Sequence, residues 1–257
     1  MNYYIDTHAH LYDDDFKSER KEIIARAIEN GVNKIILPGI DKSYHDSLLT
    51  FSAEFPGIAF PAAGLHPTSV KKDWKKEVDF VAGELSKEIF CAVGEIGIDG
   101  YWSKEFLIEQ KDAFAAQIEL ASKYNLPVII HSREATEEIF NVLEYCKKFN
   151  ISGVFHAFSG SWETYKRLMS YGNFKIGIGG VITYKNSHLP DVIKRVDLND
   201  IILETDAPWL TPVPFRGKRN EPSFIPFIAQ TIASVKDCPV EEVAHITTEN
   251  AQKLFKI

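Results

Sequence analysis

Histidine and carboxylate side chains recur in this sequence where short apolar segments end. Six such residues stand at five of these ends: His8, His10, Glu95, His131, His156 and Asp206. Burying imidazoles and carboxylates together is costly unless a cation or mutual pairing compensates. Mixed sets of histidine and carboxylate suit Zn²⁺, Mn²⁺, Fe²⁺ or related ions. The pattern therefore predicts a metal site.

The number of candidate ligands bears on how many ions bind. Six ligands exceed what one tetrahedral ion takes while it keeps an open position. We therefore expect two ions about 3.5–4 Å apart, bridged by a carboxylate, because this arrangement stabilises both the attacking and the leaving oxygen of a phosphoryl displacement. Each residue alone would prove little, since a histidine at a strand end is often structural and a carboxylate there can cap the following helix.

The apolar segments have the composition of buried strands, and segments with helical periodicity separate them. We expect eight strands, at Tyr3–His8, Asn33–Pro38, Ile58–Gly64, Ile89–Glu95, Pro127–His131, Gly153–His156, Phe174–Ile178 and Asp200–Asp206. Helical periodicity continues beyond the eighth strand, around Ile225–Lys236 and Val240–Leu254.

Eight strands alternating with helices predict a (β/α)8 barrel, in which the carboxyl ends of the strands form one rim that carries the active site. A doubly wound open sheet is the alternative, but it usually has a glycine-rich phosphate turn after the first strand. Here the first strand leads into Asp6-Thr7-His8-Ala9-His10. We therefore expect a single domain over residues 1–257, a TIM barrel with C-terminal helices.

The composition is that of an average globular protein, with 45% hydrophobic and 25% charged residues, which excludes disordered and fibrous classes. The 29 Lys and Arg residues against 36 Asp and Glu residues give a formal net charge of −7. This balance argues against a protein that coats duplex DNA through a wide basic face. No apolar run predicts a membrane span and no secretory signal is recognisable. Three cysteines without CxxC spacing favour reduced thiols, so we expect a cytoplasmic protein. No heptad pattern or long apolar stripe predicts an oligomer, so a monomer is the default expectation.

An ordered set of motifs runs through nearly the whole chain. The motifs are IDTHAHL (5–11), GLHP (64–67), GEIGID (94–99), IHSR (130–133), HAFSGS (156–161), ETDAPWL (204–210), PFRGKRNEP (214–222) and TTENAQKLF (247–255). With them the sequence resembles the TatD family of metal-dependent hydrolases, within the amidohydrolase-like superfamily, from Ile5 to Phe255.

The resemblance implies two divalent cations (Zn²⁺, Mn²⁺ or Mg²⁺) held by His8, His10 and Asp206 on one side, by His131 and His156 on the other, and by a bridging Glu95. It also implies that a water or hydroxide between the ions is the nucleophile, that Asp206 accepts the proton of the water and that Glu204 supports the ligands. TatD-like proteins are associated with DNase activity. The implied reaction is phosphodiester hydrolysis at a DNA strand end, as a 3′→5′ exonuclease.

Two departures from the family pattern fall where substrate would lie. Many members have His-Pro-His after the third strand, whereas this sequence has His66-Pro67-Thr68. Many also have an aromatic residue directly after the Gly-Ile-Asp segment, whereas here Asp99-Gly100-Tyr101-Trp102 shifts the aromatics by one position. Neither departure changes a predicted ligand, but both bear on the choice of substrate.

Cationic residues near the rim are candidates for phosphate contacts. Arg133 lies two residues past a predicted ligand on the same strand face, and its planar guanidinium suits a phosphate. His66 ends the third strand and is a candidate for the same group. In the loop after the eighth strand, Arg216 is the best candidate in a positive run that also holds Lys218 and Arg219.

Three classes of function stay open at this point. The leading hypothesis is a two-metal deoxyribonuclease with nucleic acid as its partner, and Trp102 and Trp209 on rim loops are candidates for stacking on a base. The same metal ions could instead hydrolyse an amide or an ester, such as a D-aminoacyl-tRNA ester. The phosphates of a tRNA would also contact Arg133 and the positive run from Arg216 to Arg219. A non-catalytic metal-dependent binding protein is disfavoured because no expected ligand is missing.

Overall fold

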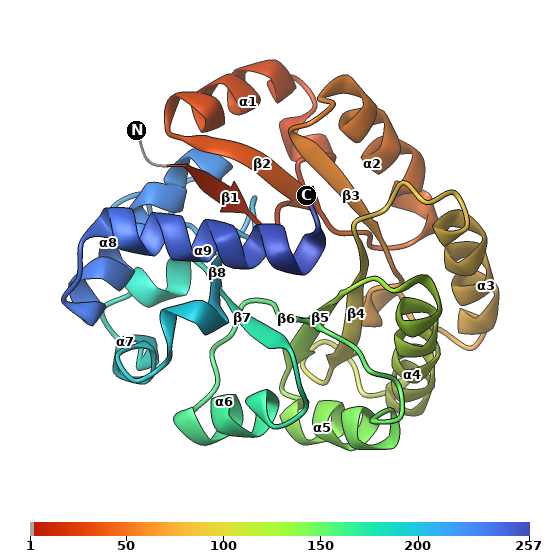
Figure 1. Ribbon diagram of the computed structural model, residues 1–257. Helices are drawn as coiled ribbons and strands as arrows, with labels where there is room; N and C mark the ends of the chain where they lie inside the picture. The colour runs from red at the N-terminus through yellow and green to blue at the C-terminus, as the bar shows by residue number, and fades with distance from the viewer. Residues whose placement is uncertain (1–2) are drawn as a thin grey trace.

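The apolar segments form eight parallel strands in a computed structural model that describes residues 3–257 (Figure 1). Each strand pairs with the next one along the chain, in the order β1 to β8. Their bounds are β1 Tyr4–Asp6, β2 Val32–Leu37, β3 Ala59–Ala63, β4 Ala92–Asp99, β5 Val128–Arg133, β6 Gly153–Phe155, β7 Phe174–Ile178 and β8 Ile201–Leu203.

The sheet closes between β1 and β8. The backbone N–H of Thr7 donates to the carbonyl of Leu203 over 3.0 Å, and the N–H of Asp206 donates to the carbonyl of His8 over 2.8 Å. Closure therefore also brings two of the predicted ligands together. The predicted (β/α)8 barrel is confirmed, and an open doubly wound sheet is excluded.

Helices surround the strands (Figure 1), and two more follow β8 as expected. Their bounds are α1 Arg20–Glu29, α2 Lys42–Glu54, α3 Trp74–Leu85, α4 Leu107–Tyr124, α5 Thr136–Tyr145, α6 Trp162–Met169, α7 Leu189–Ile193, α8 Ile225–Lys236 and α9 Val240–Phe255. Side chains cap some of them, since Asp41 accepts the backbone N–H of Ser43 at the start of α2. Gly31 follows α1 with φ of +83°, a left-handed conformation that glycine adopts without a Cβ clash.

Strand β4 corrects one predicted strand end. We expected the fourth strand to end at Glu95, but β4 continues to Asp99, which pairs with Arg133 of β5. The physical reason is that Ile96 and Ile98 are fully buried, so the apolar strand continues past the carboxylate. Glu95 therefore lies inside a strand rather than in the loop that follows it.

Helix α9 covers the end of the barrel where the strands begin, and it crosses that end in front of the strands in Figure 1. Its Ala251, Leu254 and Phe255 pack on an apolar layer inside the barrel. Seven strands each contribute one residue to this layer: Ile5, Ile36, Ala62, Ala92, Ile129, Val154 and Ile202. The layer and α9 together close this end of the barrel.

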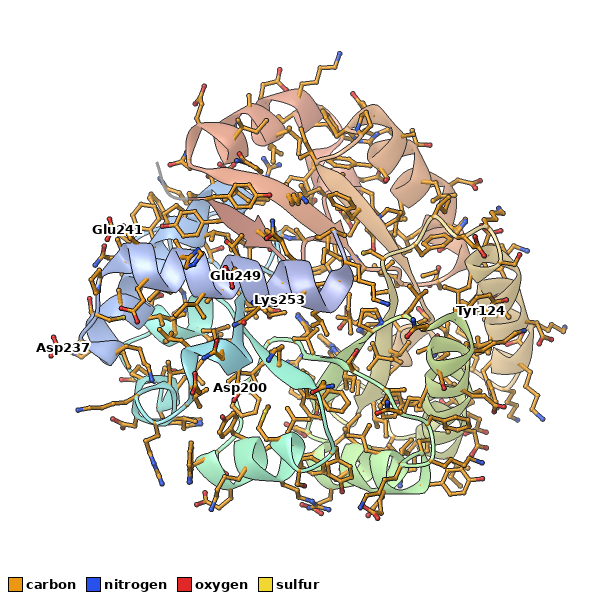
Figure 2. All side chains as sticks on the ribbon, viewed as in Figure 1. Tyr124, Asp200, Asp237, Glu241, Glu249 and Lys253 are labelled. Carbon is orange, nitrogen blue, oxygen red and sulfur yellow. The ribbon has the colours of Figure 1, made fainter. Side chains whose placement is uncertain are left out.

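Polar contacts fix α9 in place. The side-chain amide of Asn250 donates to the carbonyls of Leu198 and Ile201, each over 2.8 Å, at the start of β8. Glu249 and Lys253, labelled in Figure 2, form an ion pair of 2.8 Å in which Lys253 is exposed and Glu249 is partly exposed. The helix thus has an apolar inner face and a charged outer face, which is the pattern of an amphipathic helix on a core.

Replacing Phe255 with alanine should lower the free energy of unfolding by about 3–5 kcal/mol, because it opens a cavity between α9 and the barrel interior. Phe255 is 2% exposed. Urea unfolding followed by circular dichroism measures the change. As a control, Ile108→Ala alters a side chain of α4 that is 74% exposed, and it should change the free energy by about 0.5 kcal/mol or less. Equal changes in the two variants would contradict this role of α9.

The three cysteines are free thiols, as expected. Burial raises the pKa of Cys91 to about 12 and that of Cys146 to about 11, so both thiols stay protonated and unreactive near neutral pH. Within residues 3–257, no helix has the length and apolar character needed to cross a membrane.

Candidate metal centre

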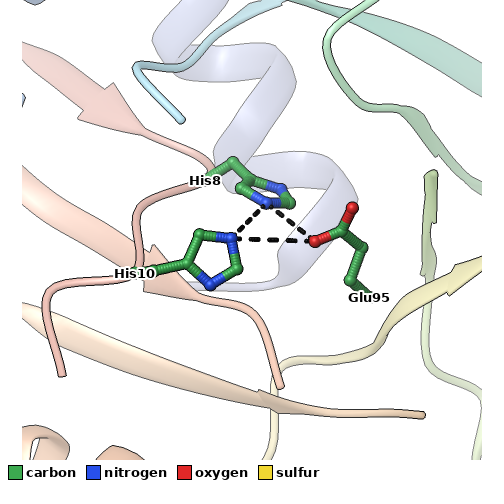
Figure 3. A group of neighbouring side chains, drawn as sticks. All are labelled: His8, His10 and Glu95. Carbon is green, nitrogen blue, oxygen red and sulfur yellow. Dashed lines mark hydrogen bonds and ion pairs between the residues drawn. The ribbon is translucent and has the colours of Figure 1, made fainter. Parts of the chain in front are cut away.

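Glu95 lies at the centre of the predicted cluster, and one of its oxygens faces two histidines that follow β1. Its Oε2 is 3.1 Å from His8 Nε2 and 3.7 Å from His10 Nε2 (Figure 3). The two Nε2 atoms are 3.2 Å apart. All three side chains are buried. Three ligand-type atoms converging in this way could hold one metal ion.

The other oxygen of Glu95 faces a second group of histidines. Its Oε1 is 2.8 Å from His131 Nδ1, 3.4 Å from His66 Nε2 and 3.6 Å from His156 Nε2. His66, Glu95 and His131 form a second group that could hold an ion. One carboxylate is thus shared between two sets of imidazoles, which is the position that a bridging ligand must occupy.

His66 belongs to this second group, although its residue type and position had suggested a substrate contact. Its Nδ1 accepts the backbone N–H of Thr68 over 3.2 Å and lies 2.7 Å from the Thr68 hydroxyl. These contacts orient the ring so that Nε2 faces Glu95. Thr68, the residue that departs from the family's His-Pro-His pattern, therefore positions a histidine of the centre.

Asp206 brings a second carboxylate to the same histidines. Its Oδ1 lies 3.7, 3.8 and 3.9 Å from the Nε2 atoms of His8, His10 and His156. Its φ of +59° is left-handed, a conformation that aspartate tolerates better than most residues. Its side chain is 14% exposed and that of Glu95 only 3%, so Asp206 is the more accessible of the two carboxylates.

Asp6 positions the segments that carry these ligands. It is fully buried, and its Oδ1 accepts the backbone N–H groups of Thr205 and His8 over 2.9 and 3.2 Å. Its Oδ2 accepts the hydroxyl of Thr205 over 2.5 Å. One side chain therefore joins the residue before Asp206 to the backbone of His8.

Glu204 is a buried carboxylate that contacts His156 of the cluster. Its Oε1 is 3.1 Å from His156 Nδ1 and accepts the backbone N–H of Ala157 over 2.5 Å. His8, His156 and Glu204 also form a group of close ligand-type atoms. Only glycine fits beside this carboxylate at position 177, since a Cβ there would lie 2.0 Å from Glu204 Oε2.

Asp99 is a member of the site that the sequence interpretation missed. Its Oδ2 is 2.9 Å from His131 Nε2, so His131 lies between the carboxylates of Glu95 and Asp99. Burial lowers the pKa of His131. Its hydrogen bonds to Asp99 and Glu95 outweigh this effect and raise the pKa to about 9. The available signal was the even spacing of Asp99 from Glu95, which places both on one face of a strand that continues past Glu95.

The cluster has an electrostatic cost that a cation would relieve. Burial raises the pKa of Asp206 to about 6 and that of Glu204 to about 7, and it lowers the pKa of His10 and His156. Among the described residues, His8 Nδ1 and Glu204 Oε2 are buried without a hydrogen-bond partner. Neutral imidazoles and ionised carboxylates are the forms that bind metals. The donor set therefore fits divalent cations.

The structure brings the other five predicted ligands together around Glu95 and adds His66 and Asp99. Their assignment as ligands of particular ions stays a prediction. Among the predicted phosphate contacts, Arg216 stacks on Tyr184, with its guanidinium carbon 3.9 Å from the ring centroid, and lines a groove of about 540 Å³. Arg219 does not join it, because its guanidinium binds Glu19 over 3.1 Å.

The profile of the family described as TatD related DNase matches residues 5–256. The chain belongs to the TatD-related DNase family. It is 38% identical to the metal-dependent hydrolase YabD of Bacillus subtilis, over 98% of each chain. The crystal structure of YJJV, the TatD homologue of Escherichia coli K12, aligns with a TM-score of 0.92 at 32% identity, covering 99% of this chain and 98% of that one.

The family predicted from the motifs is therefore confirmed. The fold also matches an amidohydrolase of Saccharomyces cerevisiae with a TM-score of 0.85 at 19% identity, over 99% of this chain and 100% of that one. With its histidine and glutamate groups, this TatD-family protein is a metal-dependent hydrolase.

Proposed function

We propose that this TatD-family protein is a deoxyribonuclease that uses two divalent cations and removes nucleotides from the 3′ end of single-stranded DNA. The observation that carries the proposal is the position of Glu95, whose two oxygens face different sets of histidines. Two ions that share a carboxylate suit an in-line displacement at phosphorus. The family description, TatD related DNase, supports DNA as the substrate.

Different residues of the chain would have different roles in hydrolysis. Bound divalent ions supply a water of lowered pKa and withdraw charge from the phosphate oxygens. Glu95 would hold both ions in place, with histidines on either side of it. Asp206, the more accessible carboxylate beside three imidazoles, would accept the proton of the attacking water.

The charge distribution supports a strand end rather than a duplex surface. The net charge of −7 disfavours a protein that covers duplex phosphates. The cationic side chains proposed to bind DNA are two arginines near the ends of strands. Arg133 follows His131 on β5, and Arg216 lies in the loop after β8. Both would contact phosphates that flank the centre, through planar guanidinium groups.

The proposal is tested with single-stranded oligonucleotides labelled at either the 5′ or the 3′ end. Protein loaded with Mg²⁺, Mn²⁺ or Zn²⁺ should shorten the 5′-labelled strand step by step and release the 3′ label first. A chelator should abolish both reactions, because the proposed chemistry needs the ions.

Oligonucleotides that stay intact with every metal would refute the deoxyribonuclease proposal. Charged D-aminoacyl-tRNA serves as the parallel substrate in the same assay. Its hydrolysis, with DNA inert, would assign the centre to ester hydrolysis instead, since the same ions can polarise a carbonyl group.

A further inference from the structure

Two aromatic side chains are exposed beside the metal centre, in the loop that follows β4. Trp102 is 69% exposed and Tyr101 is 50% exposed. Their ring centroids are 5.1 Å apart, with the planes at 83°. Leaving such large apolar surfaces in water forgoes the burial that normally stabilises aromatic residues. Adjacent exposed aromatics at an active-site rim therefore indicate a surface that binds a ligand.

Arg133 completes this surface. Its guanidinium carbon lies 3.7 Å from the Tyr101 ring centroid and 5.5 Å from the Trp102 ring. We call Tyr101, Trp102 and Arg133 the rim platform. Aromatic faces stack on nucleobases, and a guanidinium can stack on a base or bind a phosphate. The platform thus offers both kinds of contact that a nucleotide requires.

Hydrogen bonds connect the rim platform to the metal centre. Asp99 Oδ1 accepts the backbone N–H groups of Tyr101 and Trp102 over 2.9 and 3.0 Å. Asp99 Oδ2 is 2.9 Å from His131 Nε2, and His131 Nδ1 is 2.8 Å from Glu95. A single buried carboxylate therefore sets the position of the platform relative to the histidine that faces Glu95.

We propose that the rim platform binds the base of the nucleotide next to the cleaved phosphate, by stacking on Trp102, while the nearly perpendicular ring of Tyr101 supports Trp102 and Arg133 contacts the phosphate. This assignment rests on the proposed deoxyribonuclease function. Every base has a face that can stack, so the platform tolerates any sequence. A base stacks on a side chain only when it is free of its own duplex, so the platform selects single-stranded ends.

A matched control lies at the other end of the molecule. Tyr145 is the last residue of α5, is 74% exposed and has the Lys148 ammonium 5.9 Å from its ring centroid. It reproduces the exposure and the neighbouring cation of the rim platform without any contact to the metal centre. Tyr145→Ala should therefore leave the choice of substrate unchanged.

The test compares two single-stranded oligonucleotides that differ only at the terminal nucleotide, which either carries its base or is abasic. Metal-loaded wild-type protein should show a kcat/KM at least about 10-fold higher for the strand with the base, the size expected for one stacked base. In Trp102→Ala and Tyr101→Ala this ratio should fall towards one. Trp102→Phe, which keeps an aromatic face, should retain most of it.

Each outcome decides the assignment. A ratio that persists in both alanine variants, or a wild-type ratio near one, would overturn the base-binding role while the deoxyribonuclease function stands. A general loss of activity at constant ratio would also overturn it. If wild-type protein hydrolyses neither strand with any metal, the deoxyribonuclease proposal fails and this assignment fails with it.

Discussion

Glu95→Gln should lower kcat for single-stranded DNA at least about 10³-fold. The glutamine amide offers one oxygen and one nitrogen that only donates hydrogen bonds, so it cannot serve as a ligand on both sides. In the native chain the two carboxylate oxygens lie 3.1 Å from His8 Nε2 and 2.8 Å from His131 Nδ1. Metal ions stabilise charge in the transition state by several kcal/mol, and about 1.4 kcal/mol corresponds to a tenfold change in rate.

The control for this variant is Glu84→Gln. Glu84 also pairs with an imidazole, since its Oε2 is 2.8 Å from His45 Nε2, but it lies on α3 outside the centre. It should keep the wild-type kcat. Initial rates on a labelled oligonucleotide at saturating metal measure both variants, with circular dichroism to show that each is folded. Activity within tenfold of wild type in Glu95→Gln would remove Glu95 from its assigned position between the ions.

Asp206→Asn should lower kcat by about 10² to 10⁴-fold, the range expected when a positioned general base is lost. The substitution keeps the size of the side chain and one oxygen near His8, His10 and His156, so metal binding should weaken less than in the Glu95 variant. The amide cannot accept the proton of the attacking water, because its oxygen is a far weaker base than a carboxylate. The two predictions therefore separate a residue that joins the ions from one that moves a proton.

Asp200→Asn is the matched control for Asp206. Asp200 directly precedes β8, at the opposite end from Asp206, and accepts the Tyr165 hydroxyl over 2.7 Å. Its replacement should change thermal stability but not kcat measured on folded protein. Metal content, kcat and the pH dependence of kcat are measured for both variants. An Asp206→Asn variant with wild-type kcat would rule out its role in proton transfer.

Much of the barrel was predictable from local patterns. Buried strands, helix-forming segments and their alternation are encoded within short windows of sequence, so the eight strands and the two C-terminal helices were anticipated. The docking of α9 was not, because the periodicity of Val240–Leu254 shows that one face is apolar but not what it covers. That depends on the layer formed by Ile5, Ile202 and their neighbours, which exists only in the closed barrel.

The predicted ligands came together because the carboxyl ends of parallel strands meet at one rim. What the sequence did not reveal depends on exact strand length and side-chain orientation. Asp99 was missed because the fourth strand was expected to end at Glu95. The orientation of the His66 ring depends on its contact with Thr68. Arg219 lies close to Arg216 in the sequence, but its guanidinium binds Glu19.

Anomalous scattering from crystals of Mn²⁺-loaded protein tests the central claim most directly, that one carboxylate is shared between two ions. We expect two peaks about 3.5–4 Å apart, one on each side of Glu95. The first should lie beside His8 and His10, and the second beside His131. A single peak, or two peaks that share no oxygen of Glu95, would contradict the account.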